Sequence, residues 1–459
     1  MQTAFDLIVI GSGPAGRRAA VEAANLGKRT ALIERGALGG VSTNTGTVPA
    51  RTLRAAAMEL SGNAFRVRPK ITIDDLLWRT QQVIEHEQDA IADELRRSGV
   101  RVLEGSASFV GSHTLEVRDG ASPYRVRAQR IVIAVGTAPD RPAWVDFDER
   151  TVLDTESILG LTELPNRLTV VGGGVVGLEY ASMAVALGVH VTVVDAKPRL
   201  LGFVDDELVE ALQYHLRGLG LVFRLGERVK MVRRHRRGAE TLLWSGKKLA
   251  SDVVLLAGGR HGATRDLDLG AAGLAGDERG RIAVDADCRT AQPHIFAVGG
   301  VIGSPSLDAT SLEQGRLAAL AAFDLPVASA GPLPQAVYTV PELAFVGLGE
   351  RELAGSGVPY VVGTARYRET LRGEIDGDRS GLLKLYVHAK SRSVLGVHIF
   401  GTAATELVHV GQALIAGRLG VDYLTDSVFN VPTFGDAYRI AALAAADRLS
   451  DCAGLSAVA

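Results

Sequence analysis

Two glycine-rich segments of one pattern constrain this chain of 459 residues more than any other feature. Residues 11–16 read Gly-Ser-Gly-Pro-Ala-Gly, and residues 172–177 read Gly-Gly-Gly-Val-Val-Gly. Each segment follows a short apolar run that is rich in β-branched residues. In this pattern the first glycine permits a tight turn, the second lets the backbone approach a pyrophosphate, and the third lets a helix pack closely on a strand. Both segments therefore predict a strand–turn–helix unit that binds a nucleotide.

An acidic residue stands at the same offset behind each segment, Glu34 after the first and Asp195 after the second. A carboxylate at the end of the second strand of such a unit can accept hydrogen bonds from ribose hydroxyls. One fingerprint alone is weak evidence, but two of them with matching acids predict two dinucleotide sites. A flavin and a nicotinamide nucleotide are the usual pair in one chain, because hydride passes directly between them.

Composition excludes several other classes. The 50 Lys and Arg residues are balanced by 52 Asp and Glu, so the net charge of −2 argues against nucleic acid as a partner. The two cysteines, Cys288 and Cys452, are far apart, and the histidines match no ligand spacing, so we expect no disulfide framework and no metal. The apolar stretch 7–10 leads straight into a glycine turn and is expected to be a buried strand.

No apolar run reaches the roughly 18 residues that a membrane span needs, so we expect no membrane partner and a cytoplasmic location. The basic run 233–237 has two interpretations: a patch for an anionic partner, or the solvated edge of a hairpin, which charged residues protect from pairing. The balanced net charge favours the hairpin edge.

Four further segments, together with the two fingerprints, carry a resemblance to the pyridine nucleotide-disulfide oxidoreductase flavoproteins that covers essentially the whole chain. They are Gly39–Pro49, Ala134–Thr137, His294–Gly299 and Phe429–Thr433. The resemblance implies an α/β fold with two Rossmann-like dinucleotide-binding domains and a C-terminal α+β dimerisation domain, through which the chain would form a homodimer. It implies an FAD-binding domain in two segments, 1–149 and 285–331. The NAD(P)-binding domain would be 150–284, and the dimerisation domain 332–459.

The resemblance also implies site residues, with FAD and NAD(P) as cofactors and nicotinamide dinucleotides as partners. For FAD they are Gly11, Gly13, Pro14, Ala15, Gly16, Glu34, Arg35, Gly40, Ser42, Thr43, Gly46, Gly136, Thr137, Gly299, Gly300, Leu307, Ala309 and Thr310. For NAD(P) they are Gly172, Gly174, Val176, Gly177, Asp195, Lys197, Arg199 and Gly259. The expected catalytic residues are Arg51, its ion-pair partner Glu179, and Thr47.

The residues that the disulfide-reducing members use are missing. Ser42 and Thr47 stand where those members carry two cysteines, and Val431 and Asp436 stand where they carry a histidine and a glutamate. A valine has no exchangeable proton, so the acid–base partner of a thiol is absent as well. The chain instead resembles the soluble pyridine nucleotide transhydrogenase branch, which has threonine at the position of Thr47. That resemblance implies ping-pong hydride transfer between NADPH/NADP and NADH/NAD through FAD.

Three departures leave alternatives open. Arg51 replaces the family's usual lysine, and Arg is planar and forked where Lys is a point charge. Gly300 replaces an aspartate that normally binds the ribityl chain, at a cost of about 1.5–3 kcal/mol for one charge-assisted hydrogen bond. Asp308 either compensates for that loss or faces solvent. The enzyme could therefore pass electrons to a quinone or a specialised small molecule, or be a non-catalytic nucleotide-binding homologue.

The loop behind the second fingerprint leaves the choice of nucleotide open. Asp195 favours free ribose hydroxyls and would repel a 2′-phosphate, whereas Lys197 and Arg199 stand close enough in sequence to offset that repulsion.

Overall fold

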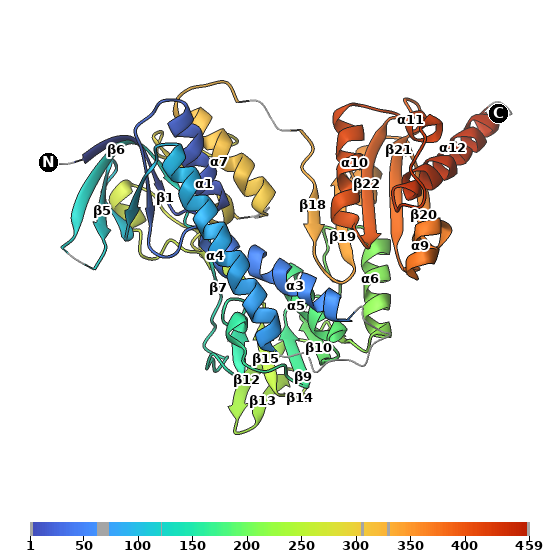
Figure 1. Ribbon diagram of the computed structural model, residues 1–459, viewed down its shortest axis with the longest axis horizontal. Helices are drawn as coiled ribbons and strands as arrows, with labels where there is room; N and C mark the ends of the chain where they lie inside the picture. The colour runs from blue at the N-terminus through green and yellow to red at the C-terminus, as the bar shows by residue number, and fades with distance from the viewer. Residues whose placement is uncertain (1–2, 62–72, 121, 304–306, 328–330, 457–459) are drawn as a thin grey trace. The chain divides into compact units, whose positions relative to one another are not determined.

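The computed structural model describes residues 3–61, 73–120, 122–303, 307–327 and 331–456. These residues divide into two compact units (Figure 1). The first unit comprises residues 1–165, 231–240 and 252–329, and the second comprises residues 166–230, 241–251 and 330–459. Each unit is α/β and contains one of the two glycine-rich segments.

The first unit is built on a sheet with the strand order β3-β2-β1-β6-β5-β4, and β17 pairs with β6. The strands β1 (Thr3–Ile10), β2 (Thr30–Glu34), β3 (Arg101–Glu104) and β17 (Ile295–Ala297) join parallel neighbours. The long strand β6 (Tyr124–Ile133) continues from β4 (Ser106–Gly111) and β5 (Thr114–Arg118) as an antiparallel meander. The last residues of β6, from Ile131 to Ile133, are buried and pair with β1 on one side and β17 on the other.

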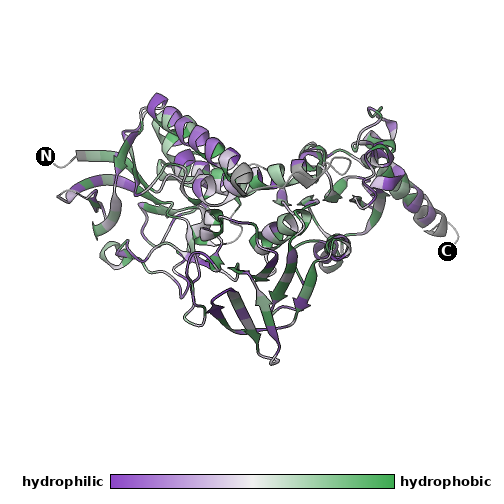
Figure 2. Ribbon diagram, turned by 60° about the horizontal axis from the view of Figure 1, so that its bottom comes forward, coloured by the Kyte–Doolittle hydropathy of each residue, from purple (hydrophilic) through white to green (hydrophobic). Residues whose placement is uncertain are grey.

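Side chains of β1 alternate between two hydrophobic cores, as the period of a strand requires. Leu7 and Val9 lie in a core that also holds residues of the helices α1 (Pro14–Asn25), α4 (Ile73–Arg97) and α7 (Asp308–Ala322). Ile8 and Ile10 lie in a second core with residues of the meander. In Figure 2 many strand segments have the hydrophobic colours, which agrees with a sheet buried on both faces.

Smaller elements of the first unit connect these layers. They are α2 (Gly40–Asn44), α3 (Thr47–Ser61), β7 (Thr137–Pro139) paired with β16 (Arg260–Gly262), β8 (Val152–Asp154) paired with β15 (Val253–Leu256), and the 3-10 turns η1 (Ser157–Gly160), η2 (Leu269–Ala272) and η3 (Gly299–Ile302). The basic run 233–237 lies at the turn between β12 (Val229–His235) and β13 (Gly238–Leu243) and is exposed, as expected for a hairpin edge. The strand β14 (Lys248–Ser251), which follows in the chain, belongs to the second unit.

The second unit begins with the predicted second strand–turn–helix repeat. The strands β9 (Arg167–Val171), β10 (His190–Asp195) and β11 (Val222–Leu225) pair in parallel, and the helices α5 (Val175–Ala186) and α6 (Asp206–Gly218) connect them. Helix α5 is buried along most of its length. The two repeats of the sequence are therefore structural repeats, one in each unit.

The C-terminal part of the second unit is an antiparallel sheet with the order β18-β19-β22-β21-β20. Its strands are β18 (Gln335–Val337), β19 (Glu342–Gly347), β20 (Tyr360–Arg366), β21 (Leu382–His388) and β22 (Val394–Gly401). The helices are α8 (Glu350–Ser356), α9 (Leu371–Asp376), α10 (Ala404–Ala416), α11 (Val421–Asp426) and α12 (Asp436–Ser456), and η4 (Tyr367–Glu369) precedes α9.

The two faces of this sheet pack against different helices. Leu383, Leu385 and Val387 of β21 share a core with α10 and α12. The alternate residues Lys384 and Tyr386 face α6, whose N-cap residue Asp205 they contact. Within the described residues, no helix combines the length and the apolar character that crossing a bilayer requires.

Candidate nucleotide-binding sites

Two glycines of the first turn are required by the fold, because a side chain there would collide with the backbone. At the third glycine a side chain would meet no protein atom. Gly11 has φ +101°, and a Cβ there would lie 2.5 Å from the carbonyl oxygen of Ala134. A Cβ on Gly16 would lie 1.9 Å from the oxygen of Gly11. A Cβ on Gly13, in contrast, would meet no heavy atom within 4 Å, and Gly13 precedes α1 without a side-chain cap. Neither a capping side chain nor a side chain of Gly13 covers the start of α1, which fits a pyrophosphate there.

Glu34, at the end of β2, accepts hydrogen bonds from this turn. Its Oε2 accepts hydrogen bonds from the backbone N–H of Ser12 at 2.8 Å and from the Ser12 hydroxyl at 2.6 Å, and its Oε1 accepts from Gly36 N–H at 3.0 Å. A carboxylate offers about four lone-pair positions, so one remains for a ribose hydroxyl. Arg35 points to the surface, where its guanidinium lies 3.8 Å from the carboxylate of Asp266.

The segment that contains α2 lies against the same turn. A Cβ on Gly40 would meet the Cα of Gly13 at 3.2 Å, and the Ser12 hydroxyl accepts a hydrogen bond from Gly39 N–H at 2.9 Å. Thr43 is buried, and Gly46 approaches the carbonyl oxygen of Val41 so closely that a Cβ would lie 2.9 Å from it. The structure therefore brings Gly40 to the fingerprint, whereas the roles of Thr43 and Gly46 toward a ligand stay predictions.

The hydroxyl of Ser42 donates a hydrogen bond of 2.5 Å to Oδ2 of Asp308 at the start of α7. Asp308 is therefore partly buried and bound to Ser42, and its compensation for the missing aspartate stays a prediction. The predicted residues Leu307, Ala309 and Thr310 lie around it, at the N-cap and in the first turn of α7.

Gly300 lies against Thr137, because a Cβ on Gly300 would be 3.1 Å from the Thr137 methyl carbon. Its neighbour Gly299 has φ +76° and donates its N–H to the side-chain oxygen of Gln314 at 2.9 Å. Gly136 adopts φ +66°, and no atom lies within 4 Å of its would-be Cβ. A side chain at Gly13 or Gly136 would thus meet no protein atom within 4 Å, whereas one at Gly300 would press on Thr137.

Arg260 is a member of this site that sequence reasoning missed. Its Nε donates to the Thr137 hydroxyl at 2.8 Å, and its Nη2 donates to the Thr137 carbonyl and to Oε1 of Glu156, each at 2.8 Å. It follows directly on Gly259, where a Cβ would lie 2.3 Å from Oδ2 of Asp140. The available sequence signal was an arginine immediately after a glycine pair that follows a buried strand.

The second glycine turn repeats the first. Gly172 has φ +113°, and Gly174 is the N-cap of α5 with no atom within 4 Å of a would-be Cβ. Oδ2 of Asp195 accepts the N–H of Gly173 at 2.6 Å, as Glu34 accepts that of Ser12 in the first unit. The backbone N–H of Lys197 donates to Oδ1 of Asp195 at 2.7 Å. Val176 and Gly177 occupy the first turn of α5.

Lys197 and Arg199 are both exposed in the loop behind β10, but Arg199 has a partner. Its Nη1 lies 3.9 Å from Oδ2 of Asp206 at the start of α6. The loop folds back onto the glycine turn through Leu200, because a Cβ on Gly173 would lie 2.5 Å from the Cδ2 atom of Leu200.

The three expected catalytic residues lie in different units. Thr47 and Arg51 are on α3 of the first unit, and Glu179 is buried on α5 of the second. The Glu179 carboxylate accepts the backbone N–H of Tyr338 at 2.9 Å. The ion pair between Arg51 and Glu179 would join the two units and stays a prediction.

The cysteine whose side chain the structure describes is not suited to redox chemistry. Cys288 is buried, and burial, followed by the charges of Asp285 and Asp287, raises the pKa of its thiol to about 11. The thiolate is the reactive form of cysteine, so this side chain is inert near neutral pH. Over the described ranges, no three His, Cys, Asp or Glu side chains gather in a way that could hold a metal ion.

Comparisons with known proteins match nearly the whole chain. The family model described as pyridine nucleotide-disulphide oxidoreductase matches residues 5–315, and that described as its dimerisation domain matches residues 333–442. A relative from Mycobacterium bovis (strain BCG / Pasteur 1173P2), named soluble pyridine nucleotide transhydrogenase, is 49% identical over 451 residues and covers 96% of each chain. A relative of the same name from Colwellia psychrerythraea is 38% identical over 460 residues, covering 97% of this chain and 98% of its own.

Solved structures of similar fold also match nearly the whole chain. The copper(II) complex of the HOCl-induced flavoprotein disulfide reductase RclA from Escherichia coli has a TM-score of 0.88 at 26% identity and covers 96% of this chain and 99% of its own. LpdA from Mycobacterium tuberculosis has the same fold, with a TM-score of 0.89 at 24% identity and the same coverage. Two glycine turns of one geometry, a C-terminal sheet domain and these matches lead to one conclusion: the chain belongs to the pyridine nucleotide-disulphide oxidoreductase family.

Proposed function

We propose that this chain is an FAD-dependent transhydrogenase, which transfers hydride between NADPH/NADP⁺ and NADH/NAD⁺. The observation that carries the proposal is the 49% identity, over 96% of both chains, to a relative named soluble pyridine nucleotide transhydrogenase. Two open glycine turns, at Gly13 and at Gly174, support it, because such an enzyme needs one site for the flavin and one for the nicotinamide nucleotide. A cytoplasmic location goes with this proposal, since nicotinamide dinucleotides are its substrates.

We propose that the first unit holds FAD. Gly13 and the first turn of α1 would receive the pyrophosphate, Glu34 a ribose, and Gly136, Thr137, Gly300 and the Ser42–Asp308 pair the rest of the molecule. The bare backbone at Gly13 and Gly136 supports this assignment, because each would-be Cβ there points into open space. When bound, FAD supplies a two-electron carrier, a chemistry that no side chain of this chain provides.

We propose that the second unit binds the nicotinamide nucleotide at Gly174, with Asp195 at the adenosine ribose. The Asp195 carboxylate is oriented by two backbone N–H groups, those of Gly173 and Lys197. A carboxylate that is held in place in this way loses little conformational entropy when it binds a hydroxyl. The predicted domain boundaries, 150–284 for this nucleotide and 332–459 for dimerisation, are proposed with it.

Residues near the proposed flavin site supply hydroxyls where a disulfide reductase needs thiols. The Ser42 hydroxyl is committed to Asp308 by a 2.5 Å hydrogen bond, and Thr47 stands at the first position of α3. Neither residue type can form a disulfide or become a thiolate. This supports the proposal that electrons leave by a second nucleotide instead of by a dithiol.

Steady-state kinetics of the purified, FAD-loaded chain with NADPH and thio-NAD⁺ would test the proposal. We expect reduced thio-NAD⁺ to accumulate, with parallel double-reciprocal lines as in a ping-pong scheme. A protein that binds FAD but transfers no hydride to thio-NAD⁺ would contradict it. Turnover with a small quinone in place of thio-NAD⁺ would instead favour a quinone-reducing enzyme.

A variant with a matched control separates the nucleotide site from the fold. Gly174→Ala places a methyl group in open space in the second turn, so the chain should fold and retain FAD while turnover falls at least about tenfold. Gly218→Ala, at the end of α6, also meets no atom within 4 Å and should retain turnover.

A further inference from the structure

The loop that follows the proposed nucleotide carboxylate is anchored at both ends. At one end, Asp195 holds the N–H groups of Gly173 and Lys197. At the other, the side chains of Leu200 and Leu201 are buried. The loop then runs into three consecutive acidic residues, Asp205–Glu207, at the start of α6.

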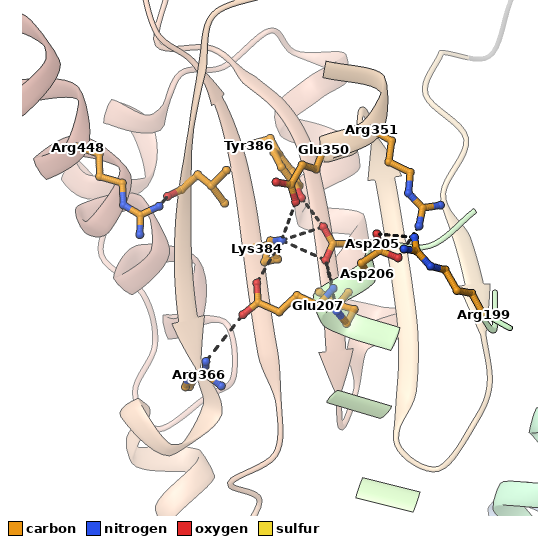
Figure 3. Close-up of polar contacts among 12 residues, drawn as sticks. Arg199, Asp205, Asp206, Glu207, Glu350, Arg351, Arg366, Lys384, Tyr386 and Arg448 are labelled. Atoms are coloured by element: carbon orange, nitrogen blue, oxygen red, sulfur yellow. Dashed lines mark hydrogen bonds and ion pairs between the residues drawn. The ribbon is translucent and has the colours of Figure 1, made fainter. Parts of the chain in front are cut away.

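Each of these acidic residues meets a cation from the C-terminal sheet or from α8 (Figure 3). Asp205 and Glu207 lie 2.9 Å and 3.2 Å from the amine of Lys384, which is buried in β21. Glu207 also lies 3.8 Å from the guanidinium of Arg366. Asp206 forms a close ion pair with Arg351 of α8, and Arg351 in addition donates to the carbonyl oxygen of Gly202.

Asp206 differs from its two neighbours because it also pairs with a residue of the loop. The guanidinium groups of Arg199 and Arg351 both reach its carboxylate (Figure 3). Both members of the Arg199–Asp206 pair are largely exposed, with 73% and 54% of their side-chain surfaces accessible. Such a pair is weak and exchangeable, so Arg199 can leave Asp206 for a stronger anion.

A 2′-phosphate is such an anion. It would replace the ribose hydroxyl that is proposed to donate a hydrogen bond to Asp195, and Asp195 stands only four residues before Arg199 in the chain. To bind it, Arg199 must give up its contact with Asp206, and the phosphate must tolerate the negative charge of Asp206 nearby. Both effects act against NADP(H), and neither touches a nucleotide with a free 2′-hydroxyl.

We propose that Asp206 is a specificity-determining residue, which pairs with Arg199 and thereby shifts the preference of the nucleotide site from NADP(H) towards NAD(H). Arg351 acts as a positioning residue for Asp206, because it holds that carboxylate and the carbonyl of Gly202 at once. This inference rests on the proposed function, since it assumes that the second glycine turn binds a nicotinamide nucleotide.

Asp206→Asn tests the inference. The amide oxygen can still accept the hydrogen bond from Arg351, so the loop remains anchored, but the negative charge is gone. We expect NADP⁺ to bind about two- to fivefold more tightly, the range that a weak surface ion pair corresponds to, and NAD⁺ affinity to change less than about twofold. The readout is isothermal titration calorimetry of the FAD-loaded full chain with NADP⁺, NAD⁺, adenosine 2′,5′-bisphosphate and AMP.

Two controls make the outcome specific. Glu207→Gln removes the same charge one residue further on without a partner in the loop, and should leave the ratio of NADP⁺ to NAD⁺ affinities within about twofold. In Asp206→Asn combined with Arg199→Ala, the gain for NADP⁺ should be smaller than in Asp206→Asn alone, because only the repulsion between Asp206 and the phosphate is then relieved. An unchanged ratio in Asp206→Asn, or a gain that is equally large without Arg199, would overturn the inference.

The same titrations separate this inference from the proposed function. If the unaltered protein binds none of the four nucleotides, the proposed nucleotide site is wrong. If it binds them and the affinity ratio ignores Asp206, the site stands and only the role of Asp206 is wrong. Binding is read without hydride transfer, so a failure of turnover cannot imitate either result.

Discussion

The glycines of the first fingerprint meet two different needs, those of the fold and those of the ligand. Gly11 and Gly16 are required by the chain itself, because a side chain at either would overlap a backbone oxygen. Gly13 meets nothing, and its φ of −59° suits any residue. A glycine that the fold does not need is best explained by a ligand that must come close to the backbone.

Gly13→Ala should therefore separate binding from folding. We expect its thermal midpoint to change by less than about 2 °C, while FAD affinity falls at least about tenfold, or about 1.4 kcal/mol. Titration of apoprotein with FAD, followed by flavin absorbance and thermal melting, measures both. Gly16→Ala is the contrasting variant and should fail to fold stably. Unchanged FAD affinity in Gly13→Ala would show that no pyrophosphate lies there.

His398 is a buried titratable residue that lies outside the proposed chemistry. Burial lowers the pKa of its imidazole to about 4, although Asp205 and Glu352 favour the charged form; Lys384 opposes it. The unfolded chain takes up this proton near pH 6.5, whereas the folded chain does not take it up until about pH 4. The free energy of unfolding must then fall, by about 3 kcal/mol from this residue, as the pH drops from 6.5 to 4.

His398→Leu should flatten that pH dependence. Between pH 6.5 and pH 4, the thermal midpoint of the variant should decrease clearly less than that of the unaltered protein, because no imidazole is left to titrate. His409→Leu, at an exposed residue of α10 that bonds to Gln412, serves as the control and should keep the original slope. Equal slopes in all three proteins would mean that His398 is protonated in the folded state.

Helix α6 has its own N-cap, but the charge of that cap residue depends on side chains from a distant strand. Asp205 caps it by accepting the N–H groups of Glu207 and Leu208 at 3.0 Å and 3.3 Å. Burial alone would raise the pKa of Asp205, but hydrogen bonds from Tyr386 and Lys384 and the charge of Lys384 outweigh it, so its pKa lies below the usual value. Its contribution to stability is thus present above about pH 4 and is lost as the pH falls further.

Lys384→Met should destabilise the second unit by about 3–5 kcal/mol, because it leaves the Asp205 carboxylate buried without its cation. The double variant Asp205→Asn with Lys384→Met should recover part of that loss, since no buried charge then remains. Differential scanning calorimetry of the three proteins measures the effect. A double variant that is less stable than Lys384→Met alone would contradict this account of the pair.

On the scale of the whole molecule, the matched dimerisation domain leaves apolar side chains on its surface. Val428 is 99% exposed, and Val431 and Tyr423 nearby in sequence are 52% and 54% exposed. Together with the family match over residues 333–442, this predicts that the loop before α12 is covered by a second copy of the chain.

Val428→Asp should weaken the homodimer without destabilising the monomer, because a side chain that is exposed in this way has little packing to lose. Analytical ultracentrifugation should show a dimer dissociation constant raised at least about tenfold. Tyr214→Asp, at a residue of α6 that is 82% exposed and lies outside the dimerisation domain, should leave it unchanged. A dimer that withstands Val428→Asp would place the interface elsewhere.

Much of the site could be read from the residues alone. The glycine turns at 11–16 and 172–177, with Glu34 and Asp195 behind them, form the repeats that their spacing predicted. Arg260 was missed because its role depends on β16 lying antiparallel to β7, a pairing of segments more than a hundred residues apart. The partner of the Asp308 side chain could not be predicted for the same reason, because Ser42 comes from α2, far away in the sequence.

The sequence by itself determined the strand–turn–helix units and the identity of the acids behind them, because tight turns and helix starts depend on residues close along the chain. Only the tertiary structure decided which charges meet. Arg199 could have been a free cation in a loop, but α6 and α8 bring Asp206 and Arg351 to it. Side chains from distant segments become neighbours only when sheets and helices pack. The spacing of residues along the chain does not specify which of these side chains will meet.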